Sequence, residues 1–291
     1  MTTRPSHESH AHLQNGRGVN GYATANGPRD PTVRRHRHHW WYIWIPLFTA
    51  FIWFSTLLAM LITWLAQGRQ FYVSESPGQK VAYISDVGAD ILKPLFIVGC
   101  SITAVGFFLT LCVERWLRHS GRLHPNMRRR ERVCSSIAMF GSFIGGAALI
   151  LLSVFDTKRH MTLHRVFLFF FVLGVAVSAI FTVLEFRWIE KSYPDATHLR
   201  RAYMLKGFLA VVLIAAAIAF GVTLGRKQNV AAIIEWCISF GFTFYLLTFY
   251  ADLRASRNVS AGELTREKLI AGGNVSPDRV PHGLAAPRAA V

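Results

Sequence analysis

The hydrophobic residues of this chain are gathered into long blocks, and polar segments rich in arginine separate them. A helix needs about 20 apolar residues to cross the roughly 30 Å hydrocarbon core of a bilayer. Six blocks reach about this length with almost no charge across their middle, as a lipid-embedded backbone requires. They cover Ile43–Leu65, Lys93–Val113, Val133–Phe155, Arg165–Phe186, Gly207–Leu224 and Ala231–Tyr250. The pattern predicts an all-α polytopic membrane protein with six transmembrane helices.

Composition narrows the class of protein further. The 291 residues are 52% hydrophobic, carry a formal net charge of +16 and include only 4 cysteines. A secreted disulfide-stapled module would need more cysteine in a shorter chain, and a disordered protein would be far less apolar. A nucleic-acid-binding domain would spread its apolar residues at amphipathic spacing. We therefore expect the lipid bilayer as the partner, and no nucleic acid.

The basic residues indicate how the chain is oriented. Of 32 Lys and Arg residues, 24 fall in the two tails and in the second-to-third and fourth-to-fifth loops. Positively charged loops stay in the cytosol, so both termini are predicted to be cytosolic. The expected organisation is a disordered basic and His-rich tail (1–39), a six-helix domain (40–254) and a disordered cytosolic tail (255–291). The sequons at Asn258 and Asn274 lie in the second tail and should remain unglycosylated.

Small residues recur in the third block. Gly141, Gly145 and Gly146 include the GxxxG spacing that lets two membrane helices approach closely. The same spacing is common by chance in apolar sequence, so the motif leaves both readings open.

Polar residues gather at the ends of the blocks that are predicted to face away from the cytosol. Asp156, His160 and His164 are spaced i, i+4 and i+8, which is one face of a helix, and Asp86 and Glu235 are expected at the same depth. These residues could hold the outer loops together, bind a lipid headgroup, or perform acid–base catalysis. The H-x-x-x-H spacing lacks the glutamate and third ligand of a zinc protease, so no metal or cofactor is expected. We assign no catalytic residue.

Charge dominates the predicted cytosolic side. Two clusters lie beside the first and third blocks and are candidate contacts for anionic lipid or a protein partner: Arg34, Arg35, Arg37, Arg128, Arg129, Arg130 and Arg132. Juxtamembrane Lys and Arg attract anionic lipid by about 1 kcal/mol each, although such clusters also simply set topology. Charge in mid-membrane is almost absent. Glu185, beside Arg187, and Lys206 are explained by pairing at the interface, which disfavours a channel or a proton-coupled transporter.

Several motifs resemble those of the DRAM/Frag/Sfk family. The stretch Glu235–Asp252 is similar to the closing helix of that family, and Y-I-S-D-x-G at Tyr83–Gly88 resembles its first-loop signature. The segment Glu114–His119, and F-D-T at Phe155 with His160 and His164 after it, look closest to the fungal Sfk-like branch. The resemblance covers roughly residues 40–254.

The resemblance implies a role and leaves the mechanism open. Sfk-like proteins are plasma-membrane regulators that are associated with phosphatidylinositol 4-kinase recruitment and phospholipid asymmetry. We accordingly expect a non-enzymatic regulator of lipid organisation, with anionic phosphoinositides and a lipid kinase complex as partners. The alternatives are a GPI-anchor or lipid-remodelling enzyme with an extracytoplasmic Asp/His site, as in Frag-like members, and a DRAM-like vacuolar or lysosomal modulator of autophagy. A Golgi or ER location is a further alternative.

Overall fold

The computed structural model describes residues 41–193, 197–257, 259–273 and 275. Its helices in chain order are η1 (Trp41–Trp44), α1 (Ile45–Ala66), α2 (Ile84–Val87), α3 (Lys93–His119), α4 (Arg129–Val154), α5 (Met161–Ser192), α6 (Thr197–Thr223), α7 (Gln228–Arg254) and α8 (Arg266–Ala271). Six of them, α1 and α3 to α7, are long and apolar enough to cross a membrane, and the described residues contain no strand. The all-α prediction and the six predicted spans are confirmed.

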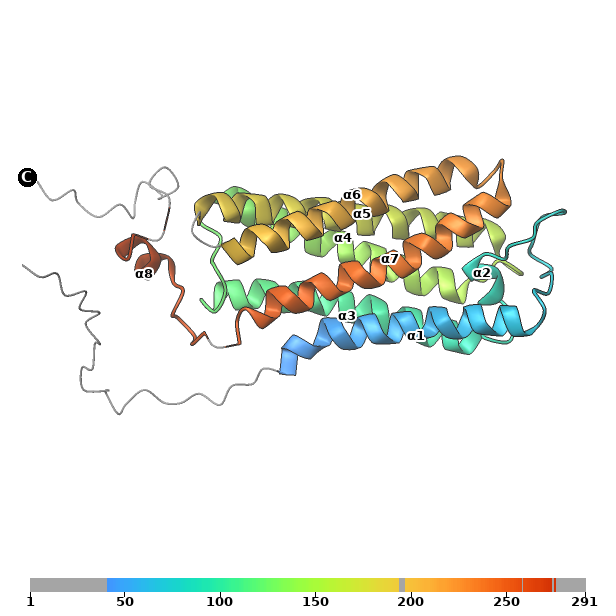
Figure 1. Cartoon of the computed structure of the whole chain (residues 1–291), viewed down its shortest axis with the longest axis horizontal. Helices are drawn as coiled ribbons and strands as arrows, with labels where there is room; N and C mark the ends of the chain where they lie inside the picture. The colour runs from blue at the N-terminus through green and yellow to red at the C-terminus, as the bar shows by residue number, and fades with distance from the viewer. Residues whose placement is uncertain (1–40, 194–196, 258, 274, 276–291) are drawn as a thin grey trace, which may run out of the picture. The chain divides into compact units, whose positions relative to one another are not determined.

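The six long helices pack in chain order (Figure 1). Each contacts the next long helix along the chain, as short connections between antiparallel helices favour, and α7 returns to pack against α1. The helices therefore form a closed ring. We call the end where α3, α5 and α7 finish the basic end, and the end that carries residues 67–92 the long-loop end. The charge count predicts that the basic end faces the cytosol.

Aromatic side chains fill the interior of the ring. Trp53 on α1, Phe107 on α3 and Phe242, Tyr245 and Phe249 on α7 are all buried. Phe107 meets the ring of Phe242 edge-on at 5.5 Å between centroids, a geometry that aromatic quadrupoles favour. The indole nitrogen of Trp53 donates to the carbonyl oxygen of Ser239 at 2.9 Å. This contact ties α1 to the middle of α7.

Glycines bring α4 very close to α5. A Cβ atom added at Gly174 of α5 would lie 2.5 Å from the backbone nitrogen of Gly145, and one added at Gly141 would lie 2.9 Å from the carbonyl oxygen of Gly174. Neither position has room for a side chain. Gly146 faces the other neighbour, at Ala104 of α3. Of the two readings of the GxxxG spacing, close helix approach is the one found in the structure.

One helix is much longer than its hydrophobic block. The block predicted a span over Arg165–Phe186, whereas α5 runs over Met161–Ser192. Beyond Phe186 the helix is amphipathic: Ile189 and Ser192 are buried, whereas Arg187 and Lys191 are exposed. A hydrophobicity pattern detects only residues that are apolar all round, so it missed this polar-faced extension at the basic end.

Part of the predicted C-terminal tail is folded. Within the described residues after α7, the short helix α8 buries Leu269 in a cluster with Met127, Phe186 and Ile189. The backbone nitrogen of Leu264 donates to the carbonyl oxygen of Gly121 at 2.9 Å. These contacts hold the segment against the loop between α3 and α4. The sequons at Asn258 and Asn274, the tail 1–39 with Arg34, Arg35 and Arg37, and residues 276–291 lie outside the described residues.

Candidate functional site

At the long-loop end, Asp86 organises the loop that covers the helix ring. It belongs to the short helix α2, is buried, and accepts hydrogen bonds from the Ser74 hydroxyl at 2.6 Å and the Tyr83 backbone nitrogen at 3.2 Å. The Thr157 hydroxyl donates to it at 3.4 Å. Burial raises the pKa of the Asp86 carboxyl above its ordinary value, and these hydrogen bonds offset part of the rise. Asp86 therefore holds the loop in place, and it also lines a polar cavity at this end of the protein.

Glu235 connects the same loop to α7. Its carboxylate accepts the backbone N–H of Ile84 at 2.9 Å, at the start of α2. The neighbouring Trp236 donates its indole N–H to the carbonyl oxygen of Ala82 at 3.0 Å. Two consecutive residues of α7 therefore hold the backbone of the first loop over the ring.

His160 and His164, at the start of α5, have different surroundings. His164 is buried, and its Nδ1 lies 2.9 Å and 3.0 Å from the carbonyl oxygens of Leu152 and Phe155. Carbonyl oxygens only accept, so Nδ1 carries a proton in these contacts. His160 is exposed and lies edge-on to the ring of Phe155.

Asp156 is engaged in an ion pair. Its carboxylate is buried beside the ammonium group of Lys93, at the start of α3, and also accepts the backbone N–H of Arg159 at 2.7 Å. Burial alone would raise the pKa of Asp156, but the hydrogen bond from Lys93 and the positive charges nearby lower it overall. Asp156 therefore joins α3 to the α4–α5 turn.

A cavity of about 310 Å³ lies between the first loop, α5, α6 and α7. Three of the five residues predicted for this end line it, namely Asp86, His164 and Glu235, whereas Asp156 and His160 do not. The structure therefore brings only part of the predicted set of residues to one cavity. The predicted set did not include the other polar residues of the wall, among them Gln79, Tyr83, Arg165 and Gln228. In the described part of the chain, no group of three or more His, Cys, Asp or Glu side chains could hold a metal ion.

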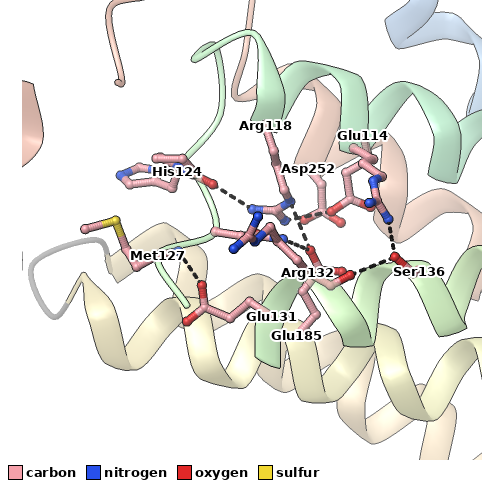
Figure 2. Close-up of polar contacts among 12 residues, drawn as sticks. Glu114, Arg118, His124, Met127, Glu131, Arg132, Ser136, Glu185 and Asp252 are labelled. Atoms are coloured by element: carbon pink, nitrogen blue, oxygen red, sulfur yellow. Dashed lines mark hydrogen bonds and ion pairs between the residues drawn. The ribbon is translucent and has the colours of Figure 1, made fainter. Parts of the chain in front are cut away.

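The basic end contains a buried network of charges that the sequence interpretation did not predict (Figure 2). The Arg118 guanidinium donates to the Glu114 carboxylate at 2.7 Å and to the carbonyl oxygen of His124 at 3.0 Å, and its Nε lies 3.7 Å from Glu185. All three charged side chains are almost fully buried. Glu185 also accepts a hydrogen bond from the Asn126 amide at 3.1 Å. The expected partner of Glu185 was Arg187, which is instead exposed.

A second ion pair lies beside this network. Lys206 on α6 is fully buried, and its ammonium group is paired with the carboxylate of Asp252 on α7. The ammonium lies 3.6 Å from the centroid of the Phe249 ring and 4.3 Å from that of Phe186. Lys206 was expected at the membrane interface. Its charge is stabilised inside the protein, by a carboxylate and two aromatic faces.

The predicted basic cluster of α4 surrounds its first turn. Glu131 is buried and accepts the backbone N–H groups of Met127 at 2.5 Å and Arg128 at 3.2 Å, which fixes the start of the helix. Arg128 is half-buried, whereas three further members of the cluster are exposed: Arg129, Arg130 and Arg132. The Arg130 guanidinium lies 5.6 Å from the centroid of the Trp188 ring.

A cleft of about 660 Å³ opens at the basic end between α3, α5, α6 and α7. The side chains of Arg118, Arg201 and Arg254 line it, together with Asp252 and apolar residues such as Leu205. Arg201 and Arg254 are exposed. The sequence pattern does not connect them, because they are 53 positions apart and belong to different polar segments. Only the packing of α6 against α7 brings them to one cleft.

Comparison with known proteins identifies the family. The Frag1/DRAM/Sfk1/Cwh43P N-terminal domain model matches residues 41–256. Protein sfk1 of Schizosaccharomyces pombe is 30% identical over 236 residues, which cover 80% of this chain and 69% of the relative. Protein SFK1 of Saccharomyces cerevisiae is 22% identical over 274 residues, which cover 73% of this chain and 78% of the relative. No solved structure gives a significant match. The chain therefore belongs to the Frag1/DRAM/Sfk1/Cwh43P N-terminal domain family and is similar to its fungal Sfk1 members.

Proposed function

We propose that this protein is a non-enzymatic integral membrane regulator of lipid organisation that binds anionic phosphoinositides at its basic end. It acts at the plasma membrane, through recruitment of a phosphoinositide kinase complex or through phospholipid asymmetry. The observation that carries the proposal is the cleft lined by Arg118, Arg201 and Arg254. An anionic headgroup is the chemical class that such a cleft suits.

The charge of the cleft is not cancelled by its surroundings. The guanidinium of Arg118 is compensated by Glu114 and Glu185, and Asp252 is paired with Lys206. Arg201 and Arg254 are exposed and add two positive charges at the mouth. Arginine side chains can bind a phosphate through two parallel hydrogen bonds. A phosphoinositide headgroup therefore has charged partners there, while Leu205 offers an apolar contact to its acyl chains.

The basic cluster of α4 reinforces the attraction. Arg129, Arg130 and Arg132 are exposed at the same end, and each basic residue near an anionic surface contributes about 1 kcal/mol. Their contribution is long-ranged and depends on ionic strength. The cleft would give selectivity, and the cluster would raise the local concentration of anionic lipid or of an acidic partner.

The proposal is tested with purified full-length protein and a short-chain phosphatidylinositol 4-phosphate. We expect the double variant Arg201→Gln/Arg254→Gln to bind it roughly 30-fold more weakly, because two charges at about 1 kcal/mol each are lost. The matched control is Arg226→Gln/Lys227→Gln, which removes two charges from the long-loop end. Equal loss of binding in both double variants, or unchanged binding in the first, would contradict the proposal.

Cells separate the proposed role from its alternatives. In cells that carry the Arg201/Arg254 double variant, less lipid kinase should be found at the plasma membrane while the variant itself is normally inserted. A tagged wild-type copy that resides on the vacuole would favour the autophagy-linked role. Loss of a lipid product in His164→Ala, at normal abundance and location, would favour a remodelling enzyme.

A further inference from the structure

The polar cavity at the long-loop end adjoins two smaller cavities in the apolar interior of the bundle, because neighbouring cavities share wall residues. A second, narrow cavity of about 50 Å³ shares His164, Leu168 and Glu235 with the 310 Å³ cavity. A third, of about 70 Å³, shares Trp53 and Phe171 with the second. The three cavities therefore succeed one another from a polar mouth to an apolar depth. This is the chemical profile of an amphiphile with a headgroup and a chain.

The apolar part has the length of an acyl chain. Its α5 wall runs from His164 to Ala179, and the 15 residue steps from one to the other rise by roughly 22 Å at 1.5 Å each. One leaflet of the hydrocarbon core is about 15 Å thick, so this wall is long enough for an acyl chain that spans one leaflet. Small side chains make the room, from Ala176 and Ala179 on α5 and Ala210 and Ala217 on α6. The narrow volume fits one flexible chain better than a rigid ring system.

The polar part presents both signs of charge. Asp86 and Glu235 place carboxylates in the wall, and Arg165 adds an exposed guanidinium. The hydroxyl of Tyr83 is buried without a hydrogen-bond partner among the described residues. Burial and then the nearby carboxylate of Glu235 raise the pKa of Tyr83 to about 12, so the hydroxyl keeps its proton and remains a donor. Because the Tyr83 hydroxyl is a donor without a partner in a polar wall, it indicates a ligand that accepts a hydrogen bond there.

We infer that these three adjoining cavities together bind one zwitterionic phospholipid from the leaflet at the long-loop end. The headgroup ammonium lies at Asp86 and Glu235, the phosphate accepts from Arg165 and Tyr83, and one acyl chain enters between α5, α6 and α7. The side-chain oxygens of Asp86 and Glu235 accept from the headgroup ammonium, which a purely anionic headgroup lacks. The site lies at the opposite end from the phosphoinositide cleft, so either assignment can fail without the other.

The inference is tested by native mass spectrometry of the full-length protein with dioleoylphosphatidylethanolamine, dioleoylphosphatidylcholine, dioleoylphosphatidylglycerol and ergosterol. We expect one tightly retained zwitterionic lipid, and weaker retention of phosphatidylglycerol and ergosterol. Tyr83→Phe should weaken the retained lipid about fivefold, because it removes one hydrogen bond to phosphate and no bond within the protein. Glu235→Gln should weaken it further while its side-chain oxygen still accepts from Ile84.

Paired variants on one helix test the chain position. Ala217→Leu fills the apolar part of the cavity and should reduce lipid retention, whereas Ala215→Leu, at an exposed position of α6, should not. Unfolding temperatures of both variants confirm that each is folded. Soluble phosphoethanolamine that binds as tightly as the lipid would show a headgroup site alone and overturn the inference. So would equal retention of all four lipids, or retention that no variant alters.

Discussion

Lys206 on α6 and Asp252 on α7 form an ion pair that is buried in the interior of the protein. The Lys206 ammonium has no exposure at all, and its charge is balanced by the carboxylate of Asp252 and by two aromatic rings. Removing ions from water is costly, and a buried pair repays that cost only while both partners remain. In the chain the two residues are 46 positions apart and each stands at the margin of a hydrophobic block. Their pairing follows from the antiparallel contact of α6 with α7.

At the residue scale we predict that Asp252→Asn lowers the free energy of unfolding by about 3–5 kcal/mol, because it leaves the Lys206 ammonium buried without its counter-charge. The double variant Lys206→Met/Asp252→Leu replaces the pair by apolar groups and should recover most of that loss. Unfolding midpoints of the purified proteins in one detergent provide the measurement. A single variant that unfolds like the wild type, or a double variant that is less stable than the single one, contradicts the prediction.

At the scale of elements, the spacing of helices is set where side chains are smallest. α4 and α5 meet at Gly141, Gly145 and Gly174. α1 and α3 meet where Gly99 faces Thr56 and Gly106 faces Thr49. Because lipid tails are as apolar as leucine, membrane helices associate through close contact and not through hydrophobic burial. The glycines therefore stabilise the ring by allowing close contact, between backbones at α4–α5 and between glycine backbone and threonine side chains at α1–α3.

We predict that Gly174→Ala destabilises the protein by about 1–3 kcal/mol, since the new methyl group would overlap the backbone of Gly145. The control is Gly221→Ala on α6, where an added Cβ has open space. That variant should be neutral or stabilising by up to about 1 kcal/mol, because alanine is the better helix former. Thermal unfolding of both proteins in the same detergent compares them. Equal unfolding temperatures would show that the α4–α5 contact is not limited by space.

At the scale of the whole molecule, the ring has two chemically different ends. The basic end combines buried ion pairs, an arginine-lined cleft and the exposed arginines of α4. The long-loop end is covered by residues 67–92, which α7 holds through Glu235 and Trp236. The positive-inside rule assigns the basic end to the cytosol. The two proposed lipid sites would then serve opposite leaflets.

Glycosylation mapping tests this orientation. We predict that an acceptor sequon inserted after Gly78, in a turn of the first loop with open space around it, is glycosylated in cells. The native sequons at Asn258 and Asn274 should remain unmodified, because the chain after α7 would lie in the cytosol. Mobility before and after endoglycosidase treatment distinguishes the states. Modification of either native sequon, without modification at the inserted one, would reverse the assigned orientation.

The six helices and the family could be predicted from the amino-acid sequence alone. Membrane burial requires continuous apolar segments, which are local properties of the chain. The motifs around Tyr83 and Glu235 are also local.

Which residues share a site depends on the tertiary structure. It brought Asp86, His164 and Glu235 to one cavity and left His160 exposed. It also gave Glu185 the partner Arg118, and Lys206 the partner Asp252. The hydrophobic pattern of a helix determines its depth in the membrane and the face that it buries. Which residue of another helix becomes its partner depends on how the six helices close into a ring.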